Sequence, residues 1–311
     1  MARRLVHRPK KALVTGASGF IGSRLVHLLL AEGVEVRAMI LPGDPAHNLD
    51  DVRADIEIVC GRLEDETACA TAVQGCDTLF HLAAIYAIWL PEPRKMFDVN
   101  VDGTRRILSA AHAAGVKRIV YTSSIAAVGT EDGTGVADEE TYFNDWDCVS
   151  DYVMSKYIAE LEVHRMCSEG LQLTIVNPSF PFGAGDVAPT PTGRIIQGIL
   201  DKLPVVFPGG FNAVGVRDVA KGHWLAALYG KRGRRYILGG ENMEYTEFAR
   251  KVTRIAGLQV RRVTVPPRLG IALGKMGDWV ADNVTHRAPL MAETSVRYTV
   301  GRHLYFDIGR A

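Results

Sequence analysis

Residues 12–22 read ALVTGASGFIG and place Gly16, Gly19 and Gly22 between an apolar run and an amphipathic stretch. Each glycine suits a phosphate site for a physical reason. The first permits a tight turn, the second lets the backbone approach a pyrophosphate, and the third lets a helix pack closely on a strand, while the helix N-terminus attracts the phosphates. The spacing is GxxGxxG rather than the commoner GxGxxG. We therefore predict a dinucleotide-binding turn between the first strand and the first helix.

The pattern around this turn repeats along the first half of the chain. Short β-branched runs alternate with longer helical patterns, which indicates successive strand–helix–strand units and a parallel sheet with helices on both faces. Right-handed crossovers then give a doubly wound α/β sheet, the Rossmann fold. The expected strands are 11–16, 34–41, 56–61, 77–84, 117–124 and 171–179, and the expected helices are 20–31, 93–114 and 151–169.

The sequence pattern changes after Pro178, where loops rich in proline and glycine separate shorter helices. Loops of this kind usually carry a site rather than a core. We expect residues 1–178 to form the dinucleotide-binding domain, rejoined by about 213–240. A smaller substrate-binding region, 179–212 and 241–311, would then lie over the carboxyl ends of the strands.

The bulk composition limits the classes of partner. The 311 residues carry a net charge of +1, with 47% hydrophobic and 23% charged residues, which is typical of a globular protein and gives no reason to expect nucleic acid as a partner. No stretch is apolar for long enough to predict a membrane span or a signal peptide, so we expect a cytoplasmic protein. The expected partner is a small-molecule substrate, and a homodimer is a possible assembly. Five cysteines without a CxxC pair are expected to be reduced thiols, mostly buried, and no metal site is expected.

A second motif supplies candidate chemistry. In the helical pattern DYVMSKYIAE, Tyr152 and Lys156 stand four residues apart and therefore on one face of a helix. A free phenol has a pKa near ~10, so a neighbouring cation would favour the phenolate and allow proton exchange nearer neutrality. Such a pair also occurs by chance on protein surfaces, and it gains meaning only beside a nucleotide site and a hydroxyl-bearing loop.

Several further stretches accompany the two motifs in a fixed order: FHLAA (80–84), DVNVDGT (98–104), YTSSIAAVG (121–129), YVMSK (152–156) and NPSFPFG (177–183). With TGASGFIG (15–22), this series resembles the extended branch of the short-chain dehydrogenase/reductase superfamily, also called the NAD-dependent epimerase/dehydratase family. The likeness is greatest to dihydroflavonol-4-reductase-like proteins and to hopanoid-associated sugar epimerases. The chain ends at FDIGRA, where relatives continue into a further helix, so we expect a missing or shortened end.

The resemblance implies a catalytic set and a cofactor, NAD or NADP. Tyr152 would be the general acid or base, Lys156 would lower its pKa and hold the nicotinamide ribose, and Ser124 would donate a hydrogen bond to the substrate oxygen. Ser123 is the alternative serine, and Asn100 matches the family's active-site asparagine. The cofactor-binding residues implied are Gly16, Ser18, Gly19, Phe20, Ile21, Gly22, Arg62, Leu63, Leu82, Ala83, Ala84, Tyr152, Lys156, Pro178 and Ser179.

Cofactor preference stays open at this stage. Ile40 stands where an acidic residue would take the adenosine ribose hydroxyls, and Leu41 stands where NADP-dependent relatives place an arginine on the 2′-phosphate. Arg62, in GRLED, could stack on adenine or reach a 2′-phosphate.

Three functions differ in what the site must hold. A dehydratase needs a carboxylate in the serine loop, and TSSIAAVG has none, so we reject it. An epimerase of nucleotide sugars needs arginines on a diphosphate; Phe211 stands where the chief one belongs, and Arg297 is either a second one or a solvated helix residue. A reductase of ketones or aldehydes needs an apolar cleft, which Tyr86, Ile88, Trp89, Phe180, Phe182 and Phe211 could form.

We therefore expect a reductase whose substrate contacts Tyr86, Trp89, Ser124, Phe180 and Phe211. The epimerase of the hopanoid-associated type is the alternative. An inactive Rossmann-type sensor or scaffold is a third reading, disfavoured by the intact Ser-Tyr-Lys set.

Overall fold

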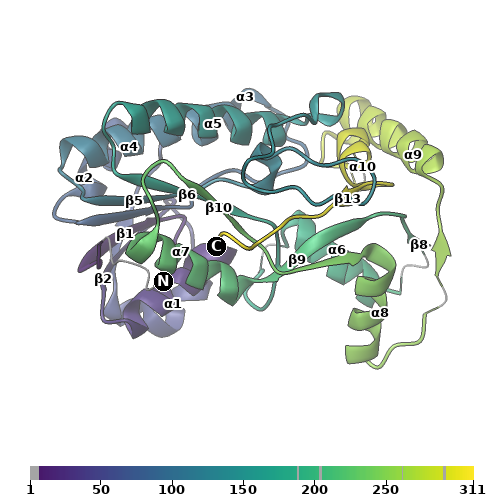
Figure 1. The fold of residues 1–311 in the computed structure, drawn as a ribbon, viewed down its shortest axis with the longest axis horizontal. Helices are drawn as coiled ribbons and strands as arrows, with labels where there is room; N and C mark the ends of the chain where they lie inside the picture. Colours follow the sequence, from purple (N-terminus) through teal and green to yellow (C-terminus); the bar gives the residue numbers. More distant parts are fainter. Residues whose placement is uncertain (1–6, 188, 203–204, 261, 290–291) are drawn as a thin grey trace.

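A parallel sheet of seven strands organises the molecule, in the order β10-β6-β5-β4-β1-β2-β3 (Figure 1). The computed structural model describes residues 7–187, 189–202, 205–260, 262–289 and 292–311. The sheet strands are β1 (Lys11–Thr15), β2 (Glu35–Ile40), β3 (Glu57–Cys60), β4 (Thr78–His81), β5 (Arg118–Thr122), β6 (Leu173–Pro178) and β10 (Arg235–Leu238). The strand order reverses between β1 and β4, and open sheets of this type bind ligands at such a reversal.

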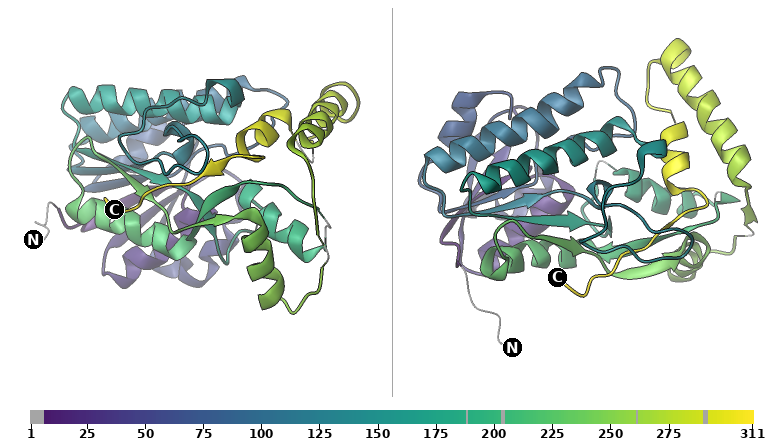
Figure 2. Two further views of the ribbon diagram at one scale, coloured as in Figure 1. Left: turned by 45° about the vertical axis from the view of Figure 1, so that its right-hand side comes forward. Right: turned by 45° about the horizontal axis from the view of Figure 1, so that its top comes forward.

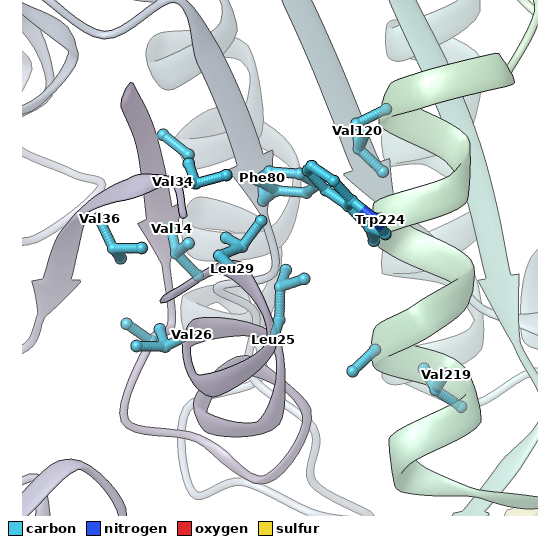
Figure 3. Packing of buried hydrophobic residues seen from close by; sticks show 14 of the residues in the cluster. Val14, Leu25, Val26, Leu29, Val34, Val36, Phe80, Val120, Val219 and Trp224 are labelled. Atoms are coloured by element: carbon cyan, nitrogen blue, oxygen red, sulfur yellow. The ribbon is translucent and has the colours of Figure 1, made fainter. Parts of the chain in front are cut away.

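Helices cover both faces of the sheet (Figure 1). One face carries α1 (Phe20–Ala31) and α7 (Val216–Tyr229), and the other carries α2 (Glu66–Val73), α4 (Thr104–Ala113) and α5 (Asp151–Ser168). In Figure 3, Leu25 and Leu29 of α1 and Trp224 of α7 pack on strand residues including Phe80 and Val120, all of them buried. The seven strands pair in parallel and helices cover both faces of the sheet, which confirms the doubly wound α/β fold predicted from the sequence.

The predicted helix 93–114 is not one regular helix. It divides into α3 (Arg94–Phe97), a π-helical turn η2 (Asp98–Gly103) and α4. A π turn inserts an extra residue into the helix, and such insertions are frequent at functional sites. The turn carries Asn100. The sequence pattern also failed to predict α2 and the 3₁₀ helix η1 (His47–Asp55).

A smaller set of elements stands at the carboxyl ends of the strands (Figures 1 and 2). In it, β11 (Glu241–Glu244), β9 (Gly210–Gly215) and β13 (His303–Leu304) pair in that order, and β7 (Phe180–Phe182) also pairs with β9. A two-stranded pair joins β8 (Val205–Val206) to β12 (Val263–Thr264). The remaining elements are α6 (Pro191–Leu200), α8 (Tyr245–Ile255), α9 (Pro267–Val280), η5 (Ala281–Thr285), α10 (Glu293–Thr299), and the 3₁₀ turns η3 (Ile125–Ala127) and η4 (Trp146–Cys148).

The cysteines and the length of the helices bear on two further expectations from the sequence. Among the cysteines whose side chains are described, Cys69, Cys76 and Cys167 are buried free thiols and Cys60 is an exposed one, in line with the expectation of reduced and mostly buried thiols. The Cys148 side chain lies outside the described part. Within the described residues, no helix combines the length and the apolar character needed to cross a bilayer. The division of the chain into two domains stays a prediction.

Candidate active site

The Gly-rich turn has the geometry that its glycines suggested. Gly16 adopts φ +67°, a left-handed conformation that favours glycine. A Cβ on Gly22 would stand 2.1 Å from the Gly16 carbonyl oxygen, so only glycine lets α1 start this close to the turn. Gly19 is the N-cap of α1 and has no side chain over the first N–H groups. An anion could therefore approach these donors directly.

A cleft of about 250 Å³ runs from this turn to the N-terminal end of α5. Most of the predicted cofactor-binding residues line it: Gly16, Gly19, Phe20, Ile21, Gly22, Leu82, Ala83, Ala84, Tyr152, Lys156, Pro178 and Ser179. It is also lined by Pro181, Thr190 and Thr192, which the sequence analysis did not name although it had marked their Pro- and Gly-rich loop as a site loop. Small side chains beside exposed helix-start donors fit a dinucleotide.

Three predicted cofactor residues lie away from the lining of this cleft. The Ser18 hydroxyl donates a hydrogen bond to Asp44 at 2.6 Å. Leu63 is buried, and a Cβ on Gly103 would stand 2.7 Å from its Cβ, so it belongs to the packing of the π turn. Arg62 is exposed on the loop between β3 and α2. Their assignment to the cofactor stays a prediction.

The Tyr152 and Lys156 side chains come from the first two turns of α5, whose N-cap is Ser150. Burial raises the pKa of Tyr152 to about 12, and a hydrogen bond with Ser124 partly offsets the rise. Ser123 lines the cofactor cleft as well, but Ser124 is the serine that bonds to Tyr152. The structure thus joins the phenol and the preferred serine hydroxyl at the cleft.

Lys156 is buried, and its Nζ donates a hydrogen bond to the Thr122 carbonyl at 2.8 Å. Nζ also lies 5.1 Å from the centre of the Tyr121 ring. Burial lowers the pKa of Lys156 to about 8, and the neighbouring Glu160 carboxylate opposes that shift. Burial is the largest influence on the Tyr152 pKa, and the Ser124 hydrogen bond opposes it. The expected effect of Lys156 on this pKa stays a prediction.

Asn100 holds backbone in place and does not line the cleft. Its Oδ1 accepts a hydrogen bond from the Ile85 N–H at 2.7 Å, and its Nδ2 donates to the Ile85 carbonyl at 3.0 Å and to Ser155 Oγ at 2.9 Å. Ser155 in turn donates to the Tyr152 carbonyl at 2.8 Å. These hydrogen bonds link the loop after β4 to α5 through Asn100. The catalytic assignment of Asn100 stays a prediction.

A buried carboxylate behind the site was missed by the sequence analysis. Glu160 Oε2 accepts a hydrogen bond from Asn177 Nδ2 at 2.8 Å, and the same amide donates to the Ser124 carbonyl at 2.9 Å. Glu160 also pairs with Arg235 at 3.1 Å. Burial raises the pKa of Glu160, but hydrogen bonds and the Arg235 charge together hold it below its usual value. A glutamate four residues after Lys156 was the available signal.

A second cavity, of about 300 Å³, opens beside the first and shares Tyr86, Ser124, Tyr152, Ser179 and Thr192 with it. The Tyr86 and Tyr152 rings lie 4.6 Å apart between centres. The rest of the lining comes from the loop after β4, η3, the start of α5, β7, α6, the segment between β8 and β9, and α10 with its flanking residues. None of the described residues that line the cavity has a charged side chain. Besides the five shared residues, they are Ala87, Ile88, Ile125, Ala126, Ser150, Val153, Phe180, Pro191, Ile195, Phe207, Ala292, Thr294, Ser295, Val296, Tyr298, Thr299 and Val300.

Two of the predicted substrate residues are placed differently by the structure. Phe211 is 0% exposed and packs against the rings of Phe180, Phe182, Tyr245 and Phe248, so it lies in the core rather than in the cavity wall. The sequence could not show this, because β9 turns that side chain toward β7 and α8.

Trp89 is also outside the cavity wall. Its Nε1 donates a hydrogen bond to Asp282 at 3.0 Å, because the loop after β4 reaches the segment that follows α9. Arg297 pairs with Glu293 at 2.7 Å on the surface of α10, which agrees with the solvated-helix reading of that arginine.

Comparison with known proteins assigns the family. Residues 12–239 match the model of the NAD dependent epimerase/dehydratase family. The chain belongs to this family. The predicted family and the predicted use of NAD or NADP are thereby confirmed, at the level of the family. The assignment of the cleft described above to that cofactor stays a prediction.

The chain is also similar to individual known proteins. The chain is 38% identical over 307 residues to a putative dihydroflavonol 4-reductase of Synechocystis sp., covering 96% of this chain and 87% of that one. It is 36% identical over 266 residues to sterol demethylase protein B of Methylococcus capsulatus, covering 85% of this chain and 80% of the relative. Among solved structures, a protein named gox2253 superposes with a TM-score of 0.84 at 36% identity, covering 97% of this chain and 91% of that one.

Proposed function

We propose that this family member is an NAD(P)(H)-dependent oxidoreductase that reduces a ketone or aldehyde of an apolar molecule. One observation carries the proposal: the cavity that opens onto Tyr152 and Ser124 has no charged side chain among its described lining residues. Covering an apolar ligand there gains about 25 cal/mol for each Å² removed from water. The names of the two relatives, a putative dihydroflavonol 4-reductase and a sterol demethylase protein, are consistent with an apolar substrate.

The chemistry requires one hydride and one proton. When bound in the cleft, the reduced cofactor supplies the hydride to the carbonyl carbon. Tyr152 donates its phenolic proton to the carbonyl oxygen, which becomes the alcohol, and Ser124 donates a hydrogen bond to the same oxygen. Because burial raises the pKa of Tyr152 to about 12, the phenol holds its proton at neutral pH, as reduction requires.

Backbone groups and neighbouring side chains would hold the cofactor and the catalytic residues in place. The turn at Gly16–Gly22 and the start of α1 would bind the pyrophosphate, and Lys156 would hold the nicotinamide ribose. Asn100 and Ser155 fix the α5 turn that carries Tyr152, and Asn177 fixes the carbonyl of Ser124. Orientation of this kind contributes to catalysis by holding reacting groups close to their reactive geometry.

The alternative epimerase is disfavoured by electrostatics. A diphosphate that enters a partly closed cavity must exchange water for fixed donors, preferably arginines. Phe211 is in the core and Arg297 is paired with Glu293, so neither supplies that charge. Burying unpaired charge costs several kcal/mol, which corresponds to a loss of roughly a thousandfold or more in affinity.

The test is turnover of a panel of apolar ketones and aldehydes beside UDP-glucose and UDP-galactose, followed by absorbance at the nicotinamide band. We expect oxidation of reduced cofactor with at least one apolar carbonyl compound and no interconversion of the UDP-sugars. Tight UDP binding in calorimetry, or interconversion with catalytic NAD, would replace this proposal by the epimerase. Cofactor binding without turnover of any compound would favour the sensor.

The substrate wall gives an independent variant. Ile195 of α6 lines the cavity. Ile195→Arg introduces a cation and should raise KM for an apolar substrate by about tenfold or more, because the charge must be desolvated when the ligand enters. Ile195→Met, which keeps an apolar side chain of similar volume, should leave KM within about threefold.

A further inference from the structure

A buried histidine that the proposed mechanism does not use lies beside the Gly-rich turn. His81 ends β4, is 1% exposed, and stands opposite Thr15 of β1 in the parallel pairing of these two strands. It belongs to the stretch FHLAA, but it does not line the cofactor cleft. Burial, followed by the nearby charge of Lys156, lowers the pKa of His81 to about 3, so the imidazole is neutral.

Both ring nitrogens of His81 are hydrogen-bonded. Nδ1 lies 2.8 Å from Thr15 Oγ1, and Nε2 lies 2.9 Å from Thr104 Oγ1 on α4. A neutral imidazole has one nitrogen that donates and one that accepts, so the ring donates to one threonine and accepts from the other. The remaining hydrogen bonds of the two threonines decide which nitrogen carries the hydrogen.

The two threonines give the same answer independently. Thr15 Oγ1 accepts hydrogen bonds from the backbone N–H groups of residues 82 and 83, at 3.2 Å each. Its two lone pairs are thereby used, and its own hydrogen is left for Nδ1. Thr104 Oγ1 donates its hydrogen to the Asn100 carbonyl at 2.7 Å, so it accepts from Nε2. His81 is therefore the Nε2–H tautomer, and the chain of donors runs in one direction from Thr15 to Asn100.

The first end of this chain joins the two walls of the cofactor cleft. Thr15 directly precedes Gly16, and a Cβ on Gly16 would stand 2.9 Å from the Ala83 nitrogen, so the Gly-rich turn lies against the segment after β4. Gly16 and residues 82–84 line the cleft. The Thr15 hydroxyl holds the two walls together, because it stands at the start of one and binds N–H groups of the other. His81 fixes the direction in which that hydroxyl points.

The second end of the chain reaches the π turn η2. The Asn100 carbonyl accepts from Thr104, while the Asn100 side chain holds the backbone of Ile85. Ile85 is followed by Tyr86, which lines both cavities. One buried imidazole therefore links the cofactor cleft to the loop that carries a residue of the substrate cavity.

We propose that His81 is a positioning residue for the dinucleotide, whose Nε2–H tautomer holds the Gly-rich turn and the segment after β4 at the separation that the cofactor requires. This inference rests on the proposed use of the cleft by NAD(P)(H). Without the imidazole, the hydroxyls of Thr15 and Thr104 each lose a buried partner. The protein would then have to order the two walls when the cofactor enters, which weakens affinity.

Two measurements that do not use turnover test the proposal. Nitrogen-15 NMR of the wild-type protein reports which ring nitrogen of His81 carries the hydrogen, and we expect Nε2. His81→Phe identifies the signal, because it removes it. The same variant keeps a buried ring and lacks both hydrogen bonds, so its Kd for NAD in calorimetry should rise by about tenfold or more, equivalent to at least one lost hydrogen bond.

A matched pair of threonines separates positioning from a general loss of stability. Thr104 and Thr253 are 2% and 7% exposed, and each donates at 2.7 Å to the carbonyl four residues earlier, but Thr104 also bonds to His81. Thr104→Val should raise the Kd for NAD by about fivefold or more, because the imidazole loses its acceptor. Thr253→Val, on α8, should leave it within about twofold. Circular dichroism checks that each variant is folded.

Three results would overturn the proposal: hydrogen on Nδ1 of His81, a folded His81→Phe that binds NAD as tightly as the wild type, or equal changes in Kd in the two threonine variants. If His81→Phe does not fold, the threonine pair decides. A wild-type protein that binds neither NAD nor NADP would overturn the proposed oxidoreductase as well, whereas unchanged binding in the variants overturns the positioning role alone.

Discussion

Tyr152 and Lys156 show how burial tunes neighbouring groups in opposite directions. Burial disfavours the charged form of each, so it raises the pKa of the phenol and lowers that of the ammonium. The phenol consequently keeps its proton at neutral pH, and Lys156 keeps its charge at a cost in stability. Thr122 and Glu160 reduce that cost through a hydrogen bond and an opposite charge.

Tyr152→Phe should remove the transferable proton and little else. We expect turnover to fall by at least about a hundredfold, which is the usual contribution of a general acid, while cofactor affinity stays near that of the wild type. Tyr157→Phe is the matched control, since Tyr157 lies on the same helix and stacks on Phe143 away from the cleft. Cofactor oxidation and a cofactor titration measure the two quantities. Turnover above a tenth of wild type would contradict the assigned role.

Lys156→Met should change the pH dependence of stability. As pH rises from about 8 towards 10.5, the folded chain loses this proton before the unfolded chain does, so wild-type stability rises with pH through that window. The variant should lack that increment. It should also be more stable at pH 7 by about 1–3 kcal/mol, which is the free-energy cost of the Lys156 pKa shift minus the contribution of the lost hydrogen bond to Thr122. Urea unfolding at several pH values, with the exposed Lys117→Met as control, checks this. Parallel wild-type and Lys156→Met profiles would disprove it.

At the scale of elements, the site depends on links between segments that are distant in the sequence. The π turn η2 presents Asn100 to the loop after β4 and to α5 at once. Asn177 on β6 joins Glu160 of α5 to the carbonyl of Ser124. Asn100 bonds through both the oxygen and the nitrogen of its side-chain amide, and Asn177 bonds through both hydrogens of its amide nitrogen. Each amide therefore fixes two elements relative to each other more firmly than a single contact would.

Asn177→Leu tests one of these links at nearly constant volume. The Ser124 carbonyl and Glu160 each lose a buried partner, so we expect the free energy of unfolding to fall by about 1–3 kcal/mol. We also expect kcat to fall by about ten- to a hundredfold, because the serine loop loses its orientation. Cofactor affinity should change less than twofold, since Asn177 does not line the cofactor cleft. An unchanged kcat for the folded fraction would show that the link is only structural.

At the scale of the whole molecule, the two cavities lie where the large sheet meets the smaller set of elements, and residues of both sets line them. Cofactor binding should therefore stabilise the complete fold. A ligand that binds only the folded state adds about 2.7 kcal/mol at a hundredfold excess over its Kd. The size of this effect with NAD and with NADP reports preference without any assumption about the substrate.

We expect NAD(H) to stabilise the protein at least as much as NADP(H), because the exposed Leu41 at the end of β2 offers a 2′-phosphate no cation. Arg62 is the remaining nearby candidate named from the sequence. Thermal unfolding of wild type and Arg62→Ala with each cofactor checks this, with the exposed Arg94→Ala as control. A strong NADP(H) preference that survives in Arg62→Ala would place the phosphate-binding residue elsewhere.

The sequence by itself determined the repeated strand–helix units, the Gly-rich turn and the order of the family's motifs, because these depend on local periodicity and on residues close together in the chain. The division of the helix at 93–114 was not predictable, since a π turn is stabilised by the contacts of Asn100 with Ile85 and Ser155, which lie elsewhere in the chain.

Only the tertiary structure decided which aromatic residues face the cavity. Tyr86 and Phe180 line it, whereas Phe211 is buried beneath it and Trp89 bonds to Asp282. An apolar residue has the same sequence signature in a core and in a binding cavity, because both remove it from water. Whether such a residue lies in the core or in the cavity wall is decided when strands such as β9 pair with their neighbours. That pairing brings together residues that are far apart in the chain.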